Sequence, residues 1–254
     1  NFTVGVSSYD TTCNTCDEAV HANYSFKVNS STSFNGEDAL IANIETGNAK
    51  SSYRLLTEGY VIGDGTLKVA DLYYTRPIGD FLVAGGPLFA MDALVATTTS
   101  SYSNDGLFNG WWYGPNGYSN HPKDGYPGVA VAYTADNGFN AGLSAIFAGG
   151  EDATSGILTK ESYDVATLSV GYDSDNWGGG LIYTQYEDPT AILTNITLSA
   201  ADLGSPVFIG LGGYWNVSDN FDISLGVDWL DVAYSNYETI TTWSVGADYD
   251  GLGA

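Results

Sequence analysis

The chain is poor in basic residues and in histidines, and each shortage excludes a class of function. Lysine and arginine together number 7 against 30 acidic residues, which gives a formal net charge of −23. Proteins that bind nucleic acids need basic surfaces to neutralise phosphates, so we expect no nucleic-acid partner. The 2 histidines, His21 and His121, have no nucleophile at motif spacing, and no hydrolase motif or phosphate-binding loop occurs. We therefore predict no enzyme activity, although glycoside hydrolysis by paired carboxylates stays an alternative in so acidic a chain.

Long apolar stretches are also missing. No run of about 18 apolar residues occurs, which excludes a helical membrane span. The apolar spacing of three and four residues that marks an amphipathic helix does not persist anywhere. No N-terminal stretch combines basic residues, an apolar core and a cleavage site, so we expect any signal peptide to lie outside this sequence. The chain is therefore interpreted through strands rather than helices.

Cysteine is scarce as well, with Cys13 and Cys16 in one short polar segment. A redox pair of this spacing needs a βαβ setting, and none follows. A structural zinc site needs about four ligands, and only Asp17 and His21 lie near enough to help. We predict a local disulfide, which would indicate an oxidising compartment. A pair of free thiols and a metal site are the alternatives.

Alternation of apolar with small or polar residues recurs along the chain with a period of two. From 221 to 229 the residues Phe221, Ile223, Leu225, Val227 and Trp229 share one face, and Asp, Ser, Gly and Asp lie between them. The ranges 22–28, 139–147, 166–172 and 243–249 show the same pattern. Such alternation predicts β-strands that have one apolar and one polar face.

Short turns rich in Asp, Asn and Gly separate these strands, and an aromatic residue stands on either side of each. Three copies run from Tyr133 to Phe139, from Tyr172 to Trp177 and from Trp215 to Phe221. Short turns at one end and long loops at the other are typical of outer-membrane barrels, where Tyr and Trp lie at the lipid–water interface. A soluble β-sandwich or β-solenoid is the alternative, and it gives less reason for aromatic residues beside so many turns.

The sequence thus predicts an all-β fold, a transmembrane antiparallel up-and-down β-barrel that is porin-like. Residues 1–254 form a single barrel domain in this prediction. About twelve strands are expected, with boundaries good to about two to four residues. They are Thr3–Ser8, Ala22–Thr32, Ala39–Thr46, Lys68–Arg76, Phe81–Leu88, Gly128–Thr134, Phe139–Ala148, Asp164–Asp173, Trp177–Glu187, Val207–Trp215, Phe221–Leu230 and Thr241–Tyr249. Because a barrel in lipid must close to pair its backbone groups, we expect closing strands outside this sequence and about 14–16 strands in the full protein.

Four segments carry a family resemblance. They are Thr-Ser-Phe-Asn-Gly-Glu-Asp-Ala-Leu at 32–40 with Glu-Thr-Gly-Asn at 45–48, Leu-Tyr-Tyr-Thr-Arg-Pro-Ile-Gly-Asp at 72–80, Gly-Gly-Pro-Leu at 85–88 and Ala-Tyr-Thr-Ala-Asp-Asn-Gly-Phe at 132–139. These segments are similar to those of cyanobacterial outer-membrane porins, within the carbohydrate-selective or iron-uptake porin family. The resemblance implies a porin of a Gram-negative-type outer membrane, commonly a homotrimer. In that family an S-layer-homology domain precedes the barrel, so cell-wall attachment would need a domain that is not in this sequence.

The polar strand faces become the candidate pore lining if the apolar faces meet lipid. Five carboxylates and one lysine fall on them, and carboxylates in a water-filled pore favour cations. We predict a mild cation preference. The alternative is that these charges are solvated in a wide pore and select little. The candidate pore-lining residues are Lys27, Asn43, Glu45, Asp71, Asp222, Asp228 and Asp248.

The longest connection, 90–128, is predicted to fold into the barrel as a constriction loop, because long loops without structure of their own are usually functional. Its aromatic rings could stack on sugar faces, and the alternative is a surface loop at a subunit interface. No cofactor is predicted. The acidic stretches 173–175 and 228–231 leave Ca²⁺ open but lack the full ligand spacing of a calcium loop. The constriction candidates are Asp92, Asp105, Trp111, Trp112, Tyr113, Lys123 and Asp124.

Together these features predict an outer-membrane porin for passive diffusion of small ions and polar solutes, surrounded by outer-membrane lipid. The main alternative is a secreted or surface-attached β-rich protein that binds carbohydrate or Ca²⁺ through residues 111–113 and the acidic loops.

Overall fold

The structure, a computed structural model, describes residues 2–7, 21–48, 64–89, 94, 96, 125–154, 156–159, 163–187, 205–231 and 239–249. In this part of the chain no helix is long and apolar enough to cross a membrane. The strands are β1 (Phe2–Ser7), β2 (His21–Thr32), β3 (Ala39–Gly47), β4 (Lys68–Ile78), β5 (Phe81–Phe89), β6 (Tyr126–Thr134), β7 (Phe139–Ala148), β8 (Tyr163–Asp173), β9 (Trp177–Tyr186), β10 (Val207–Ser218), β11 (Phe221–Asp231) and β12 (Ile240–Tyr249).

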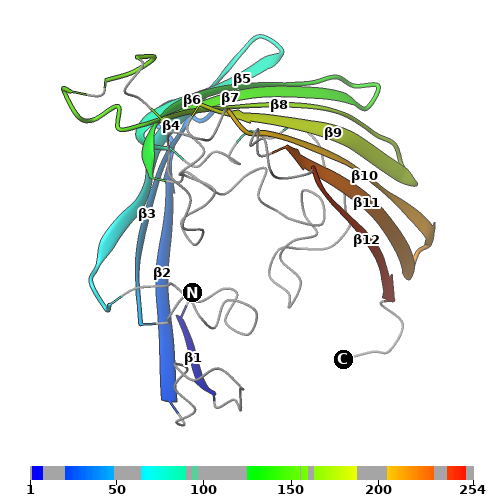
Figure 1. The fold of residues 1–254 in the computed structure, drawn as a ribbon, viewed down its shortest axis with the longest axis horizontal. Coiled ribbons are helices and arrows are strands. Elements are labelled where there is room, and N and C mark those ends of the chain that lie inside the picture. The colour runs from blue at the N-terminus through cyan, green and yellow to red at the C-terminus, as the bar shows by residue number, and fades with distance from the viewer. Residues whose placement is uncertain are drawn as a thin grey trace.

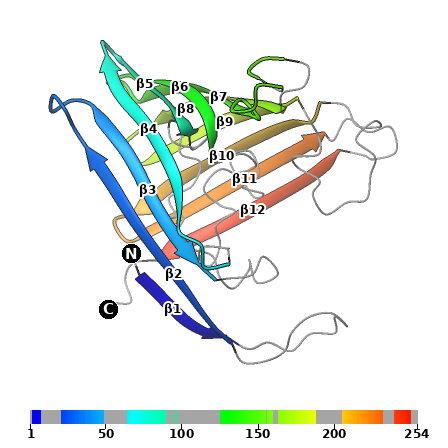
Figure 2. The ribbon, with the colours of Figure 1, turned by 90° about the vertical axis from the view of Figure 1, so that its left-hand side faces the viewer.

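All these strands form one antiparallel sheet in which each strand pairs with its neighbour in sequence, in the order β1 to β12. The sheet curves into an open arc with β1 and β12 at its two ends (Figure 1), and the strands run obliquely side by side (Figure 2). Within the described ranges no pairing joins β1 to β12. This up-and-down arrangement confirms the predicted fold. The largest boundary difference is at β10, which continues to Ser218 rather than ending at Trp215.

The short connections all lie at one end of the sheet. They are residues 33–38, 79–80, 135–138, 174–176 and 219–220. Gly79 and Gly138 take positive φ values of 60° and 92°, a conformation that glycine adopts without a steric cost. The connections that follow β1, β3, β5, β7, β9 and β11 are longer and join strand ends at the other end of the sheet. We call these the turn end and the loop end.

The two faces of the sheet differ in chemistry, as the alternation predicts. Cross-strand partners point to the same side, and one ladder of partners runs from Ser144 through Thr167 and Thr184 to Phe208. These side chains are buried on the concave face, where the Thr167 and Thr184 hydroxyls lie 2.9 Å apart. The alternate residues form the outward face, where large apolar side chains such as Leu143 stay exposed.

The outward face carries a row of aromatic side chains at the turn end. Four direct cross-strand pairs form it: Phe81 with Tyr133, Phe139 with Tyr172, Trp177 with Trp215, and Phe221 with Tyr249. Ring contacts continue the row within and between pairs. The ring centroids of Phe81 and Tyr133 lie 5.3 Å apart, and those of Tyr172 and Trp177 lie 5.2 Å apart. The predicted aromatic residues beside the turns thus share one level of one face.

One β-bulge changes the register between β3 and β4. Asn43 pairs with Asp71 but Ile44 pairs with Val69, so Ala70 is the extra residue. The extra residue interrupts the alternation, so the side chains of β4 before the bulge point to the face opposite to the one that strict alternation would give. It therefore places Lys68 on the concave face, opposite Glu45.

Across β5 to β10 the concave face is apolar toward the loop end, which differs from the expectation of small and polar residues along its whole length. A cluster there contains Phe89, Ile146, Val165, Tyr186 and Phe208 with other residues. Every one of these five side chains is almost fully buried. Alternation alone cannot show this, because Ile146 stands in a polar position of its strand pattern. On β3 and β4, by contrast, Glu45 and Lys68 bring charged side chains of the concave face to the loop end.

Candidate functional site: the concave face

The register places all seven predicted pore-lining residues on the concave face. Lys27 faces Glu45, Asn43 faces Asp71, and Asp222 faces Asp248 across neighbouring strands. Asp228 lies on β11 at the same parity as Asp222, opposite Gly210, and is completely buried. The seven residues form two sectors, one on β2–β4 and the other on β11–β12, rather than a ring.

In the β2–β4 sector the acidic charge is balanced. Glu45 lies between two lysines, with Lys68 Nζ 2.8 Å from Glu45 Oε1 and Lys27 Nζ 4.0 Å from Glu45 Oε2. Asn43 Nδ2 donates a hydrogen bond of 2.7 Å to Asp71 Oδ2. Lys68 was not among the predicted residues, because strand parity without the bulge puts it on the outward face. Two lysines therefore oppose the two carboxylates of this sector.

In the β11–β12 sector acidic residues face each other. Asp222 has Asn216 as its partner on β10 and Asp248 as its partner on β12. Like charges directly opposite in adjacent strands repel each other. A cation between them would lower that repulsion, so this sector differs in electrostatic character from the β2–β4 sector.

A hydrogen-bonded group at the turn end links three strands of the concave face. Asp173 on β8 accepts a 2.7 Å hydrogen bond from Asn140 Nδ2 and a 3.2 Å bond from the Tyr214 hydroxyl. Gly178 on β9 lies beneath the Tyr214 ring, and a Cβ at Gly178 would overlap both Tyr214 and Asp173. The glycine thus lets Tyr214 reach across β9. Alternation gave no signal for this group, because the contact depends on the absence of one side chain.

Two residues of the connection after β5, Leu94 and Ala96, lie against the concave face. Leu94 is buried in the apolar cluster, and the Ala96 N–H donates a 3.1 Å hydrogen bond to Ser169 Oγ. Gly142 leaves room there, because a Cβ would come within 2.7 Å of the Leu94 carbonyl oxygen. This segment therefore lies on the concave side of the sheet.

The seven predicted constriction residues, including Asp92, Trp111 and Lys123, lie outside the described residues, as do Cys13 and Cys16. Within the described ranges no group of three or more His, Cys, Asp or Glu side chains could hold a metal ion.

An antiparallel up-and-down sheet with an apolar outward face, an aromatic row and a polar concave face defines the class of transmembrane β-barrels. OprB of Pseudomonas putida has this fold with a TM-score of 0.62 at 12% identity, over 99% of this chain and 69% of that chain. A loop-deletion mutant of OmpT, an outer membrane protein of Vibrio cholerae, gives 0.55 at 14% identity, over 99% of this chain and 74% of that chain. A multiple mutant of the Rh. blastica porin gives 0.50 at 13% identity, over 100% of this chain and 86% of that chain.

No protein-family model matches the chain, and no curated protein matches it significantly in sequence. At these identities the structural likeness shows the porin-like fold.

Proposed function

We propose that this chain forms the wall of an outer-membrane porin through which small ions and polar solutes diffuse passively. The observation that carries the proposal is the division of one curved sheet into an apolar outward face and a concave face with hydrogen-bonded polar and charged side chains. Lipid can cover the first and water the second, which is the arrangement of barrels that enclose an aqueous channel. The likeness to OprB, whose chain has the same fold, supports it. The proposed location is the outer membrane of a Gram-negative-type bacterium.

The proposal includes a mild cation preference that comes from one sector of the wall. Glu45 is balanced by Lys27 and Lys68, whereas Asp222 and Asp248 face each other. Carboxylates that line a water-filled pore lower the energy of cations and raise that of anions. The β11–β12 sector therefore attracts cations, and the β2–β4 sector contributes little.

The constriction loop is also part of the proposal. Leu94 and Ala96, which belong to the same connection, lie against the concave face, and this supports the proposal. Residues 111–113 would then narrow the pore. Replacing Trp111, Trp112 and Tyr113 together by alanine should raise the single-channel conductance. Unchanged conductance would remove this loop from the pore.

A planar bilayer with purified protein tests the main proposal. The protein should need detergent for extraction, migrate differently on a gel before and after heating, and give stepwise currents. Under a KCl gradient the sign of the reversal potential should show greater permeability to K⁺ than to Cl⁻. Partitioning into buffer without detergent, or the absence of any current, would overturn the porin assignment. Equal or greater permeability to Cl⁻ would overturn only the cation preference.

Homotrimeric assembly, carbohydrate passage, a cyanobacterial source and attachment to the cell wall stay predictions from the sequence segments. Crosslinking of the detergent-solubilised protein tests the first, and swelling of liposomes in sugar solutions tests the second.

A further inference from the structure

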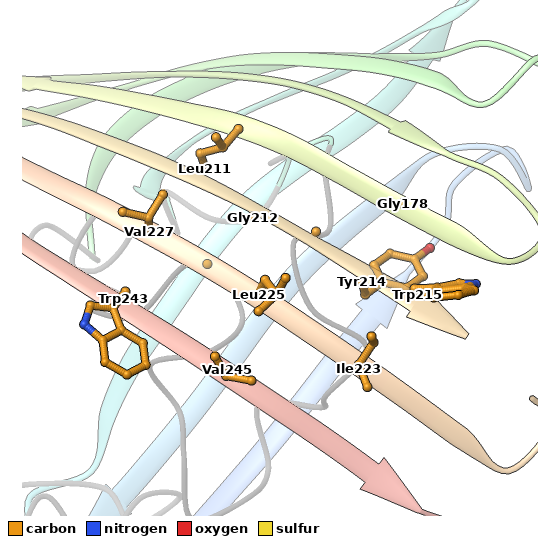
Figure 3. Close-up of a pocket in the computed structure, with 12 residues that line it drawn as sticks. Gly178, Leu211, Gly212, Tyr214, Trp215, Ile223, Leu225, Val227, Trp243 and Val245 are labelled. Atoms are coloured by element: carbon orange, nitrogen blue, oxygen red, sulfur yellow. The ribbon is translucent and has the colours of Figure 1, made fainter. Parts of the chain in front are cut away.

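An apolar depression of about 600 Å³ lies on the outward face of the sheet across β10, β11 and β12. Leu211, Leu225, Val227 and Val245 line it, with Trp215 toward the turn end and Trp243 toward the loop end. Figure 3 shows these side chains along the three strands, with the two indoles at opposite ends. Leu225 and Trp243 are exposed by 60% and 75%, so protein in the described part of the chain does not cover them.

Gly213 leaves the floor of the depression without a side chain. Gly213 on β10 takes an outward position opposite Gly179 on β9 and Leu225 on β11. The outward face therefore lacks side chains at two adjacent positions, where other strand pairs carry residues such as Leu143 and Leu168. The backbones also approach closely, because a Cβ at Gly213 would come within 2.9 Å of the Gly178 carbonyl oxygen. The floor is thus bare backbone, and larger side chains surround it.

The chemistry of the lining fits hydrocarbon. Its side chains are aliphatic or aromatic, and none is charged. A peptide segment placed here would bring backbone N–H and C=O groups against carbon, which costs free energy when they find no partner. A second copy of the chain needs about 800 Å² per partner for a stable interface, which is far more than the surface that lines this depression. An empty depression in lipid would forfeit van der Waals contacts along its walls.

We propose that the depression holds an acyl chain of a phospholipid whose headgroup lies beside Trp215. The inference rests on the proposed function, since it requires that the outward face meet a membrane. Trp215 belongs to the aromatic row at the turn end, and such rows lie at the headgroup level. From Trp215 to Leu211 the depression runs four residues along β10, which is about 14 Å toward the middle of the bilayer. The lipid belongs to the leaflet that faces the short turns.

Native mass spectrometry of the detergent-solubilised protein with palmitoyl-oleoyl phosphatidylethanolamine tests this inference. In Leu225→Trp the indole can lie over Gly213 and fill the depression, as aromatic side chains cover cross-strand glycines. Leu143→Trp is the matched control, because Leu143 is an outward leucine of similar exposure, 51% against 60%. Its cross-strand partners are Val131 and Leu168, and neither is a glycine.

We expect the wild type to hold one phospholipid, and Leu225→Trp to bind it at least about tenfold more weakly. Leu143→Trp should stay within about twofold of the wild type, as for other exposed substitutions. Equal lipid binding by the two variants, or no stoichiometric binding by the wild type, would overturn the acyl-chain site. A dimer crosslinked through a cysteine in Val245→Cys would also overturn it, because a second copy of the chain would then occupy the depression. Channel current, measured on the same samples, separates the two proposals. Normal current with equal lipid binding overturns the site alone, whereas lost current in the wild type overturns the porin function.

Discussion

Asp222 on β11 and Asp248 on β12 are direct cross-strand partners, so two carboxylates of the concave face stand opposite each other. If this face lines a pore, the pair should set its cation preference. A unit charge about 10 Å from an ion in water contributes on the order of 0.4 kcal/mol, about a twofold change in ion concentration. Each carboxylate raises the concentration of K⁺ and lowers that of Cl⁻ by this factor, so replacing both by asparagine should lower the permeability ratio of K⁺ to Cl⁻ by about sixteenfold at most, measured from reversal potentials.

The control for that prediction removes two carboxylates elsewhere. Asp136→Asn combined with Asp219→Asn changes the net charge equally but acts in exposed turns between strands. The control should keep most of the wild-type selectivity. The difference in selectivity between the two double variants should shrink at high salt, where charges are screened. An equal loss in both double variants would assign the preference to net charge rather than to this sector.

Glu45 should balance the charge of two lysines on the concave face. Its two neighbours, Lys27 and Lys68, are released when Glu45 becomes glutamine. We expect Glu45→Gln to shift the reversal potential toward Cl⁻, and Lys68→Met to shift it toward K⁺. The double variant should return close to the wild type, because it removes one charge of each sign. If the reversal potential shifts in the same direction in both single variants, the three side chains do not act together.

The turn between β2 and β3 should depend on the ionised form of Asp38. Its carboxylate accepts hydrogen bonds from the Tyr74 hydroxyl, from Ser33 Oγ at 2.7 Å and from the Phe34 N–H at 2.8 Å. These bonds, led by that of Tyr74, hold the pKa of Asp38 well below its usual range. A lowered pKa in the folded state means stabilisation that is complete above the unfolded pKa of about 3.9 and decreases as pH falls below it toward the folded pKa.

Asp38→Asn tests that dependence through urea unfolding in detergent at pH 7 and at pH 3. The variant should unfold at a lower urea concentration than the wild type at pH 7. The difference between the two unfolding midpoints should narrow at pH 3, because the wild type has begun to lose the stabilisation that ionised Asp38 provides. Asp136→Asn, the same chemical change in an exposed turn, should show no such narrowing. A constant difference at both pH values would contradict the role of the charge.

Gly178 should be required because Tyr214 lies over it. Gly178→Ala places a Cβ in the space of the Tyr214 ring and Asp173, and overpacking of this kind costs about 1–3 kcal/mol. In a Tyr214→Ala background the same glycine substitution should cost less, which a double-mutant cycle of unfolding free energies measures. Equal costs in the two backgrounds would mean that the ring does not set the requirement for glycine.

The strands and the two faces could be predicted because alternation is a local property of the chain. Every predicted strand is present, and the pairs Lys27–Glu45 and Asn43–Asp71 share the face that parity gave them. Lys68 was missed because a bulge at Ala70 depends on how β3 and β4 pair, and pairing is not written in either strand alone.

The apolar end of the concave face and the group around Asp173 were missed for a related reason. Ile146 stands at a polar position of its own strand, and its place in one buried cluster with Phe89 and Phe208 from other strands explains why that position is apolar. Tyr214 reaches Asp173 only because Gly178 lies between them on β9. Both features join residues from strands that are distant in sequence, and a single sequence does not show which strands meet.

The pairing of every strand with its neighbour in sequence has a consequence for how the molecule assembles. Contacts between sequence neighbours close small loops first, which favours fast local steps. The sheet can therefore grow hairpin by hairpin, and each finished strand exposes an edge that templates the next. An interruption within one hairpin would leave the strands before it already in register.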